Sequence, residues 1–121
     1  MRARTAETYV TAGRVYEAYG HLWQAELSYR GAIEVAPNQA IGYRVLSLLL
    51  LRSRSSPAEA KSLAAKVAQF EPSAPSFALL SQACRISGDR PGAIQAIDRA
   101  VQLDPKNDTY RRMRQTLEAM K

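Results

Sequence analysis

The sequence predicts an all-α protein in which similar helix hairpins lie in a row and one further helix closes the end. Alanine is abundant and clusters of β-branched residues are few, a composition that favours helices. Apolar and small residues also recur at fixed intervals, which is typical of a repeated structural unit. With 121 residues, of which 46% are hydrophobic, we expect a single domain over residues 1–121.

Seven positions near the start of the chain recur 68 residues later, with every interval between them preserved. The first set is Tyr9, Gly13, Tyr16, Ala25, Tyr29, Ala32 and Pro37, and the second is Phe77, Ser81, Cys84, Ala93, Ile97, Ala100 and Pro105. A weaker copy lies between them and comprises Tyr43, Ser47, Leu50, Ala60, Ala64, Val67 and Pro72. The middle copy has one extra residue in its internal turn, around Arg54. A period of about 34 residues predicts three repeats, at about 6–39, 40–73 and 74–107.

Within each repeat the pattern predicts two antiparallel helices. An aromatic residue, a small residue four positions later and a bulky residue three positions after that share one face of the first helix. The small residue, Gly13 in the first repeat, allows the second helix to approach closely. Gly20 and Gly88 predict turns between helices, because glycine relieves the end of a helix. Proline suits the first turn of a helix and cannot continue one. The prolines at predicted starts of second helices are Pro57 and Pro91, and those that end second helices are Pro37, Pro72 and Pro105.

This pattern resembles the tetratricopeptide repeat over roughly residues 6–107. Tyr9, Tyr43 and Phe77 stand where that family usually has tryptophan, and Trp23 lies instead in the turn that leads to the second helix of the first repeat. The resemblance implies a right-handed α-solenoid of three hairpins. It also implies that the first helices line a concave groove and the second helices form the convex back.

The helix expected at about residues 41–52 is apolar on every face, whereas a surface helix keeps one polar side. It is too short to cross a bilayer, which takes about 20 apolar residues, so we expect no transmembrane segment. Protein must therefore cover this helix on more than one side. Leu46, Leu49 and Leu50 are expected to face the core of their own repeat. The side chains left for the groove are Ile41, Val45, Leu48 and Leu51.

A closing helix is expected at about residues 108–121, with Asp108 or Thr109 as its N-cap. Tyr110, Met113 and Leu117 recur on one face of it, while its arginines point away. A repeat array needs such a helix, because an open last repeat would leave an apolar face bare.

The chain offers few residues for catalysis. It has one histidine and one cysteine, without the spacing of a metal site, so we expect neither an enzyme nor a cofactor. Cys84 occupies a core position and is expected to be a buried structural thiol. The net charge is +6, but the arginines are scattered and interleaved with glutamates, which does not favour nucleic acid as the partner. The start of the sequence has no apolar stretch typical of a signal peptide, so we expect a cytoplasmic protein.

The remaining expectation is a protein-interaction module, an adaptor or scaffold that binds a peptide or helix of a partner protein in the groove. The residues expected to contact it are Val10, Arg14, Ile41, Arg44, Val45, Leu48, Leu51 and Gln82. The aliphatic side chains would anchor the partner, and Arg14 and Arg44 would bind an acidic group or main-chain carbonyls.

Three alternatives remain open at this point. The same groove could join copies of the chain into a homo-oligomer, or the chain could be a regulatory part of a larger protein. Leu48 and Leu51 could also contact only the neighbouring repeats. One branch of the tetratricopeptide family binds the C-terminal carboxylate of chaperones through lysines and asparagines. The matching positions here are Val10, Arg14, Val45, Pro75 and Leu79, which disfavours that ligand.

Overall fold

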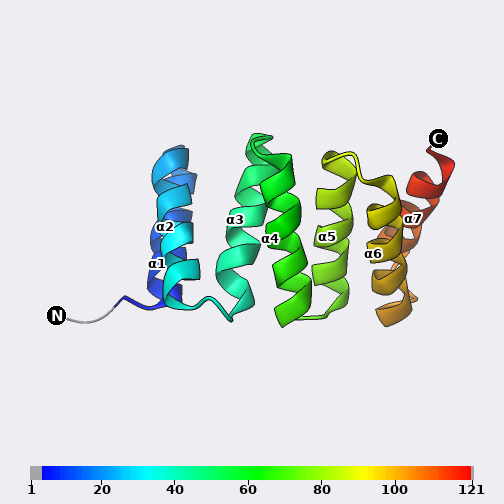
Figure 1. The fold of residues 1–121 in the computed structure, drawn as a ribbon, viewed down its shortest axis with the longest axis horizontal. Coiled ribbons are helices and arrows are strands. Elements are labelled where there is room, and N and C mark those ends of the chain that lie inside the picture. Colours follow the sequence, from blue (N-terminus) through cyan, green and yellow to red (C-terminus); the bar gives the residue numbers. More distant parts are fainter. Residues whose placement is uncertain (1–3, 121) are drawn as a thin grey trace.

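The computed structural model describes residues 4–120, and the chain folds there into seven helices and no strands. The helices are α1 (Ala6–Ala18), α2 (Leu22–Val35), α3 (Ala40–Ser53), α4 (Pro57–Phe70), α5 (Ala74–Ile86), α6 (Arg90–Leu103) and α7 (Asp108–Ala119). They stand side by side in a row, with the two ends of the chain at opposite ends of the row (Figure 1). The main contacts are within the hairpins α1–α2, α3–α4 and α5–α6, and then between each second helix and the helix that follows it. The architecture is an all-α solenoid.

The turns inside the hairpins form in two ways. Gly20 and Gly88 have φ angles of 76° and 86°, the left-handed conformation that glycine adopts without strain. The middle turn has no glycine, and Arg54 and Ser56 take positive φ angles of 54° and 48° instead. The backbone N–H of Ser55 donates to the carbonyl of Leu50 (3.1 Å), and the other two turns have the equivalent hydrogen bond.

The small residue of each first helix sets how closely the hairpin closes. In the second and third hairpins it is a buried serine. The hydroxyl of Ser47 donates to the carbonyl of Ala60 (3.1 Å), and that of Ser81 donates to the carbonyl of Ala93 (2.7 Å). In the first hairpin Gly13 lies against the ring of Tyr29, and a Cβ added there would come within 2.3 Å of a ring carbon. The hairpins therefore use different pairs of side chains for the same close approach.

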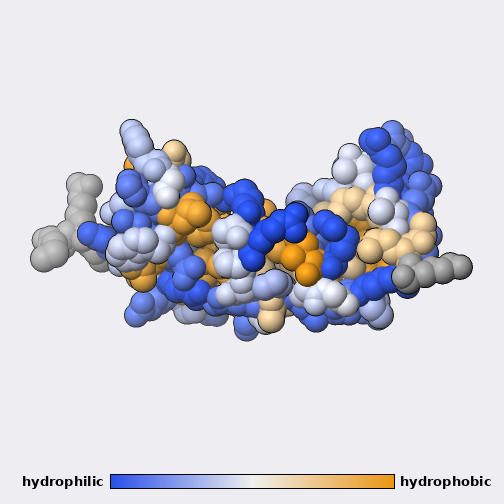
Figure 2. All heavy atoms as spheres, turned by 90° about the horizontal axis from the view of Figure 1, so that it is seen from above, coloured by the Kyte–Doolittle hydropathy of each residue, from blue (hydrophilic) through white to orange (hydrophobic). Residues whose placement is uncertain are grey.

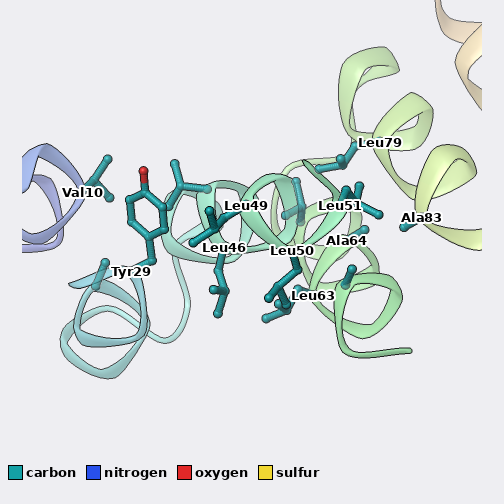
Figure 3. Close-up of a cluster of buried hydrophobic side chains, with 14 of the residues drawn as sticks. Val10, Tyr29, Leu46, Leu49, Leu50, Leu51, Leu63, Ala64, Leu79 and Ala83 are labelled. Carbon is teal, nitrogen blue, oxygen red and sulfur yellow. The ribbon is translucent and has the colours of Figure 1, made fainter. Parts of the chain in front are cut away.

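The leucines of α3 hold neighbouring hairpins together. Leu46, Leu49 and Leu50 are at most 3% exposed, as the sequence predicts. Figure 3 shows Leu46 and Leu49 on the side of α3 toward Tyr29, and Leu50 beside Leu63 of α4. The same buried cluster extends from α1 to α5. Protein covers α3 on several sides, which explains its lack of a polar face.

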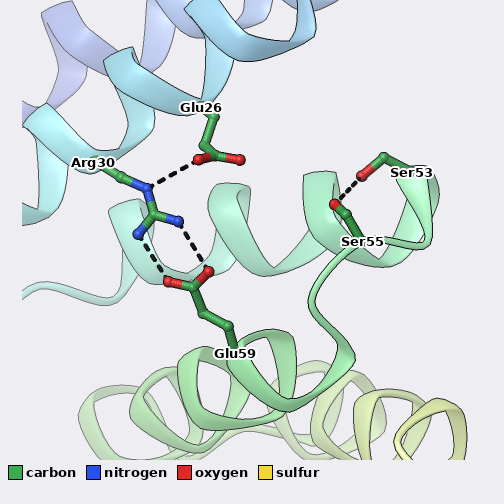
Figure 4. A network of polar contacts seen from close by, with 5 residues as sticks. All are labelled: Glu26, Arg30, Ser53, Ser55 and Glu59. Carbon is green, nitrogen blue, oxygen red and sulfur yellow. Dashed lines mark hydrogen bonds and ion pairs between the residues drawn. The ribbon is translucent and has the colours of Figure 1, made fainter.

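Ion pairs join successive second helices on the outside of this core. Arg30 of α2 binds Glu59 of α4 through two hydrogen bonds of 2.8 and 2.9 Å, and it also binds Glu26 (3.2 Å; Figure 4). Hydrogen bonds from Arg30 hold the pKa of Glu59 below its usual value. Lys61 of α4 binds Asp89, the N-cap of α6 (2.8 Å). Partly exposed pairs of this kind contribute little energy each, but their geometry fixes how one hairpin sits on the next.

The closing helix α7 packs on the third hairpin through Leu117, Tyr110 and Met113. Its N-cap is Asn107, whose side chain accepts a hydrogen bond from the N–H of Tyr110 (3.1 Å). The sequence-based choice of Asp108 or Thr109 is therefore wrong by one or two positions, because Asn107 is an equally good cap. The far end of α7 is held by Arg90, which donates to the carbonyls of Leu117 (2.9 Å) and Glu118 (3.1 Å).

Replacing Gly13→Ala should lower the free energy of unfolding by about 1–3 kcal/mol, because the added methyl group collides with the ring of Tyr29. Urea denaturation measures this change. The double variant Gly13→Ser, Tyr29→Ala reproduces the pairing of Ser47 with Ala64 in the second hairpin, so its loss of stability should be smaller than the sum of the two single losses. An additive result would show that the two residues do not constrain each other.

Replacing Arg90→Met should loosen the end of α7, because the last carbonyls of a helix have no partner within it. We expect faster amide hydrogen exchange near Leu117 and a loss of about 1 kcal/mol in stability. Arg111→Met, which removes a side chain from the other end of α7, is the matched control. Equal exchange in the two variants would contradict the role assigned to Arg90.

Candidate functional site

One side of the helix row is hollowed between its two ends (Figure 2, seen along the helices). Two hollows are lined mainly by α1, α3, α5 and α7, which we call the first-helix face. The N-terminal hollow has a volume of about 340 Å³ and is lined by Arg14, Glu17, Ala18, Tyr29, Val45, Leu48 and Arg52. The C-terminal hollow has a volume of about 560 Å³ and is lined by Ser81, Gln82, Arg85, Thr109, Arg112, Met113, Thr116 and Leu117.

A charged network forms the wall of the N-terminal hollow. The hydroxyl of Tyr29 donates to one carboxylate oxygen of Glu17 (2.7 Å), and the guanidinium of Arg52 donates to the other. Arg14 lies one turn before Glu17 on the same side of α1. One arginine binds this carboxylate and a second lines the same hollow, so the wall carries a net positive charge.

The hydroxyl of Tyr29 keeps its proton near neutral pH. Burial and the hydrogen bond to Glu17 raise the pKa of Tyr29 well above its usual value, so its hydroxyl stays a donor. The floor beneath these groups is apolar and consists of the Tyr29 ring and the side chains of Val45 and Leu48. Leu48 is half-buried, whereas Val45 is only 6% exposed. An incoming aliphatic side chain can thus contact Leu48 beneath a charged rim.

The C-terminal hollow lies between α5 and α7 and has the same plan. Arg85 and Arg112 are exposed at its rim, with Gln82 beside them, and Met113 and Leu117 form the apolar part. Its lining residues include no acid. The local charge is therefore more positive than in the N-terminal hollow.

Four of the eight residues expected to contact a partner line these hollows. Arg14, Val45 and Leu48 meet in the N-terminal hollow, and Gln82 lines the C-terminal one. The other four are elsewhere: Val10, Ile41, Arg44 and Leu51.

The sequence overestimates the open apolar surface of α1 and α3. Val10 is 3% exposed, and Val45 and Leu51 are 6% exposed each, so all three belong mainly to the core. The physical reason is that α1 and α5 both contact α3 and close over it. Arg44, expected to bind a partner, is instead held by Glu71 (3.1 Å) and Ser76 (3.0 Å) of the same chain. Whether the remaining predicted residues bind a partner stays a prediction.

Several lining residues were not singled out from the sequence. Arg52 follows Leu48 by four positions, and this spacing on a helix could have placed it on the same side. Tyr29 is one of the recurring positions of the repeat and is buried, but its hydroxyl reaches the hollow. The arginines of α7 were expected to point away, yet Arg112 lines the C-terminal hollow. No sequence signal distinguishes Arg112 from Arg111.

Within residues 4–120, no group of three or more His, Cys, Asp or Glu side chains is arranged to hold a metal ion. Cys84 is buried, and burial raises the pKa of its thiol. In the same part of the chain, none of the helices combines the length and the apolar character needed to cross a membrane.

No protein-family model and no curated protein matches the sequence. Solved structures do match its fold. The MamA protein of Desulfovibrio magneticus RS-1, from residue 41 onward, is 20% identical, with a TM-score of 0.83 and coverage of 93% of this chain and 64% of that one. The second TPR domain of human RPAP3, in complex with the HSP70 peptide SGPTIEEVD, is 17% identical, with a TM-score of 0.84 and coverage of 95% and 96%. The Sgt2 TPR domain of Aspergillus fumigatus is 18% identical, with a TM-score of 0.80 and coverage of 93% and 76%.

These similarities show that the chain has the fold of tetratricopeptide-repeat domains, as the sequence pattern predicts. The chain spans less than two thirds of the length of the MamA chains that it matches. At such low identity the comparison concerns the fold alone.

Replacing Tyr29→Phe removes the hydroxyl that donates to Glu17 and leaves this partly buried carboxylate with fewer partners. The free energy of unfolding should fall by about 0.5–1.5 kcal/mol, measured by urea denaturation. Tyr16→Phe in the same hairpin is the control, since no hydrogen bond of the Tyr16 hydroxyl is found among residues 4–120. An equal loss in both variants would contradict a specific role of the Tyr29 hydroxyl.

Proposed function

We propose that the chain is a protein-interaction module that binds an acidic, extended or helical segment of a partner protein along the first-helix face. The observation that carries this proposal is the shared plan of the two hollows, each with an apolar floor and two arginines at its rim. Opposite charges bring such partners together and orient them, and apolar anchors supply most of the affinity.

The apolar part of the binding energy would come from a few contacts. Leu48 and Met113 are half-buried, so each retains exposed surface that a partner can cover. Complete burial of one aliphatic side chain contributes about 1.5–3 kcal/mol. Ordering a flexible partner segment offsets part of this gain.

The charges favour carboxylates inside the partner segment over its terminal carboxylate. The family's terminal-carboxylate clamp uses lysines and asparagines at positions that here hold Val10, Arg14, Val45, Pro75 and Leu79. Val10, Val45 and Leu79 are buried and apolar, so they offer no hydrogen bond donor. The RPAP3 structure contains an acidic chaperone peptide. We propose that this chain also selects acidic and aliphatic side chains but does not require a chain end.

Self-association through the same face has less support. It would need a broad apolar stripe on α3, and burial of Val45 and Leu51 leaves only the half-buried Ile41 and Leu48.

A displayed library of random peptides, selected against the wild-type chain, tests the proposal. We expect recovered peptides to combine Asp or Glu with Leu, Ile or Val, and amidation of their C-terminus to leave affinity unchanged. Leu48→Glu, and separately the pair Arg85→Glu, Arg112→Glu, should each weaken binding by at least about tenfold, equivalent to about 1.4 kcal/mol.

Variants on other surfaces serve as matched controls. Leu27→Glu repeats the leucine change at an exposed site on α2, and the pair Lys66→Glu, Lys106→Glu repeats the charge reversal away from both hollows. Both controls should bind like the wild type. The proposal is wrong if the groove variants bind as tightly as the controls, or if amidation abolishes binding.

A further inference from the structure

The outer side of α1 carries large apolar side chains at positions that are buried elsewhere in the chain. Val15 and Tyr16 are 52% and 41% exposed. The equivalent residues of the second hairpin, Leu49 and Leu50, are 3% and 2% exposed, and those of the third hairpin, Ala83 and Cys84, are 0% and 3% exposed. Tyr19, 77% exposed, continues this side of α1 by one turn. We call Ala12, Val15, Tyr16 and Tyr19 the end face.

The difference follows from the position of the first hairpin in the row. In the second and third hairpins the preceding second helix packs on the first helix, as α2 does on α3 and α4 does on α5. Among residues 4–120, Figure 1 shows no helix beyond α1 and α2 at their end of the row. Seven of the nine large apolar side chains found exposed within residues 4–120 lie in this hairpin. The end face therefore has the character of an internal contact surface without its covering helix.

The end face is also uncharged where the internal contacts carry ion pairs. Glu59 binds Arg30 of the preceding second helix, and the equivalent position in the first hairpin is Gln24. Because Gln24 is neutral, covering this surface would not bury a carboxylate that lacks a partner. The net charge of +6 makes copies of the chain repel each other in general, so an uncharged apolar face is the place where two copies can approach most closely.

The opposite end of the row is a poor partner for this face. The outer side of α7 exposes Arg111, Gln115 and Glu118. Head-to-tail stacking would place these polar groups against Val15 and Tyr19. The polar groups would then lose their contact with water without gaining new hydrogen-bond partners, which costs free energy. Association of end face with end face avoids this cost.

We propose that the end face binds the end face of a second copy, which gives a two-fold symmetric dimer. Such a contact closes on itself, because both copies use the same surface. Tyr16 and Tyr19 together expose about 200–300 Å² if a fully buried aromatic side chain covers 150–250 Å². This supplies roughly a third of the 800 Å² or so that each partner buries in a standard interface. Leu22 and Trp23, at the turn just after Tyr19, extend the apolar surface with exposures of 45% and 67%.

This dimer does not depend on the proposed peptide binding. Arg14 and Ala18 lie on the groove side of α1, whereas Val15 and Tyr19 lie on its outer side. The hollows of both copies therefore stay open in the dimer. A partner with two acidic segments could bind both and gain affinity from the second attachment.

Sedimentation velocity across micromolar to near-millimolar concentrations tests the dimer. The wild-type chain should double its mass as concentration rises, and high salt should preserve the dimer, because salt screens the repulsion between the copies. The pair Val15→Glu, Tyr19→Glu should weaken association at least a hundredfold. Because both side chains are largely exposed, circular dichroism should show unchanged helix content.

Two control variants locate the interface. The pair Gln102→Glu, Gln115→Glu adds the same charge at exposed sites away from the end face, and Leu48→Glu alters the groove. Both should dimerise like the wild type. The proposal is overturned if the wild type stays monomeric at every concentration, if it forms assemblies that grow beyond a dimer, or if Leu48→Glu rather than the end-face pair dissociates it.

Discussion

Burial of the α3 leucines is the interaction on which the rest of the structure depends. No single hairpin of this length can bury its apolar surface alone, so stability comes from stacking neighbours. Leu46, Leu49 and Leu50 place one continuous cluster between the hairpins, and α3 contacts α1, α2, α4 and α5. The hollows of the first-helix face are positioned by this packing, because their walls belong to α1, α3, α5 and α7.

The elements of the fold could be predicted from the sequence because they depend on local rules. Gly20 and Gly88 adopt the left-handed conformation of a turn without strain, and Pro57 suits the start of a helix. Both effects are independent of how the hairpins pack together. Burial of Val45 and Leu51 could not be predicted in the same way. It depends on how each first helix is rotated relative to the next one. Packing between side chains of separate hairpins sets this rotation.

The chemistry of the candidate site was predictable only in part for a related reason. Leu48 and Arg14 follow from helix periodicity, and the structure brings them into one hollow. The expectation for Arg44 does not include its contacts with Glu71 and Ser76, because these residues are distant from it in sequence. A long flexible side chain takes whichever partner the tertiary fold brings within reach. The network of Tyr29, Glu17 and Arg52 spans three helices and has no local signature.

The ion pair of Arg30 with Glu59 also means that the three hairpins are not interchangeable units. The residues equivalent to Arg30 in the later hairpins are Ala65 and Asp98. If the middle hairpin were duplicated in tandem, Glu59 of the new copy would face an alanine and lose both of its hydrogen bonds. Lengthening this array by gene duplication would therefore leave a carboxylate without its partner at the new junction. The outward-facing charges thus distinguish the present units from one another.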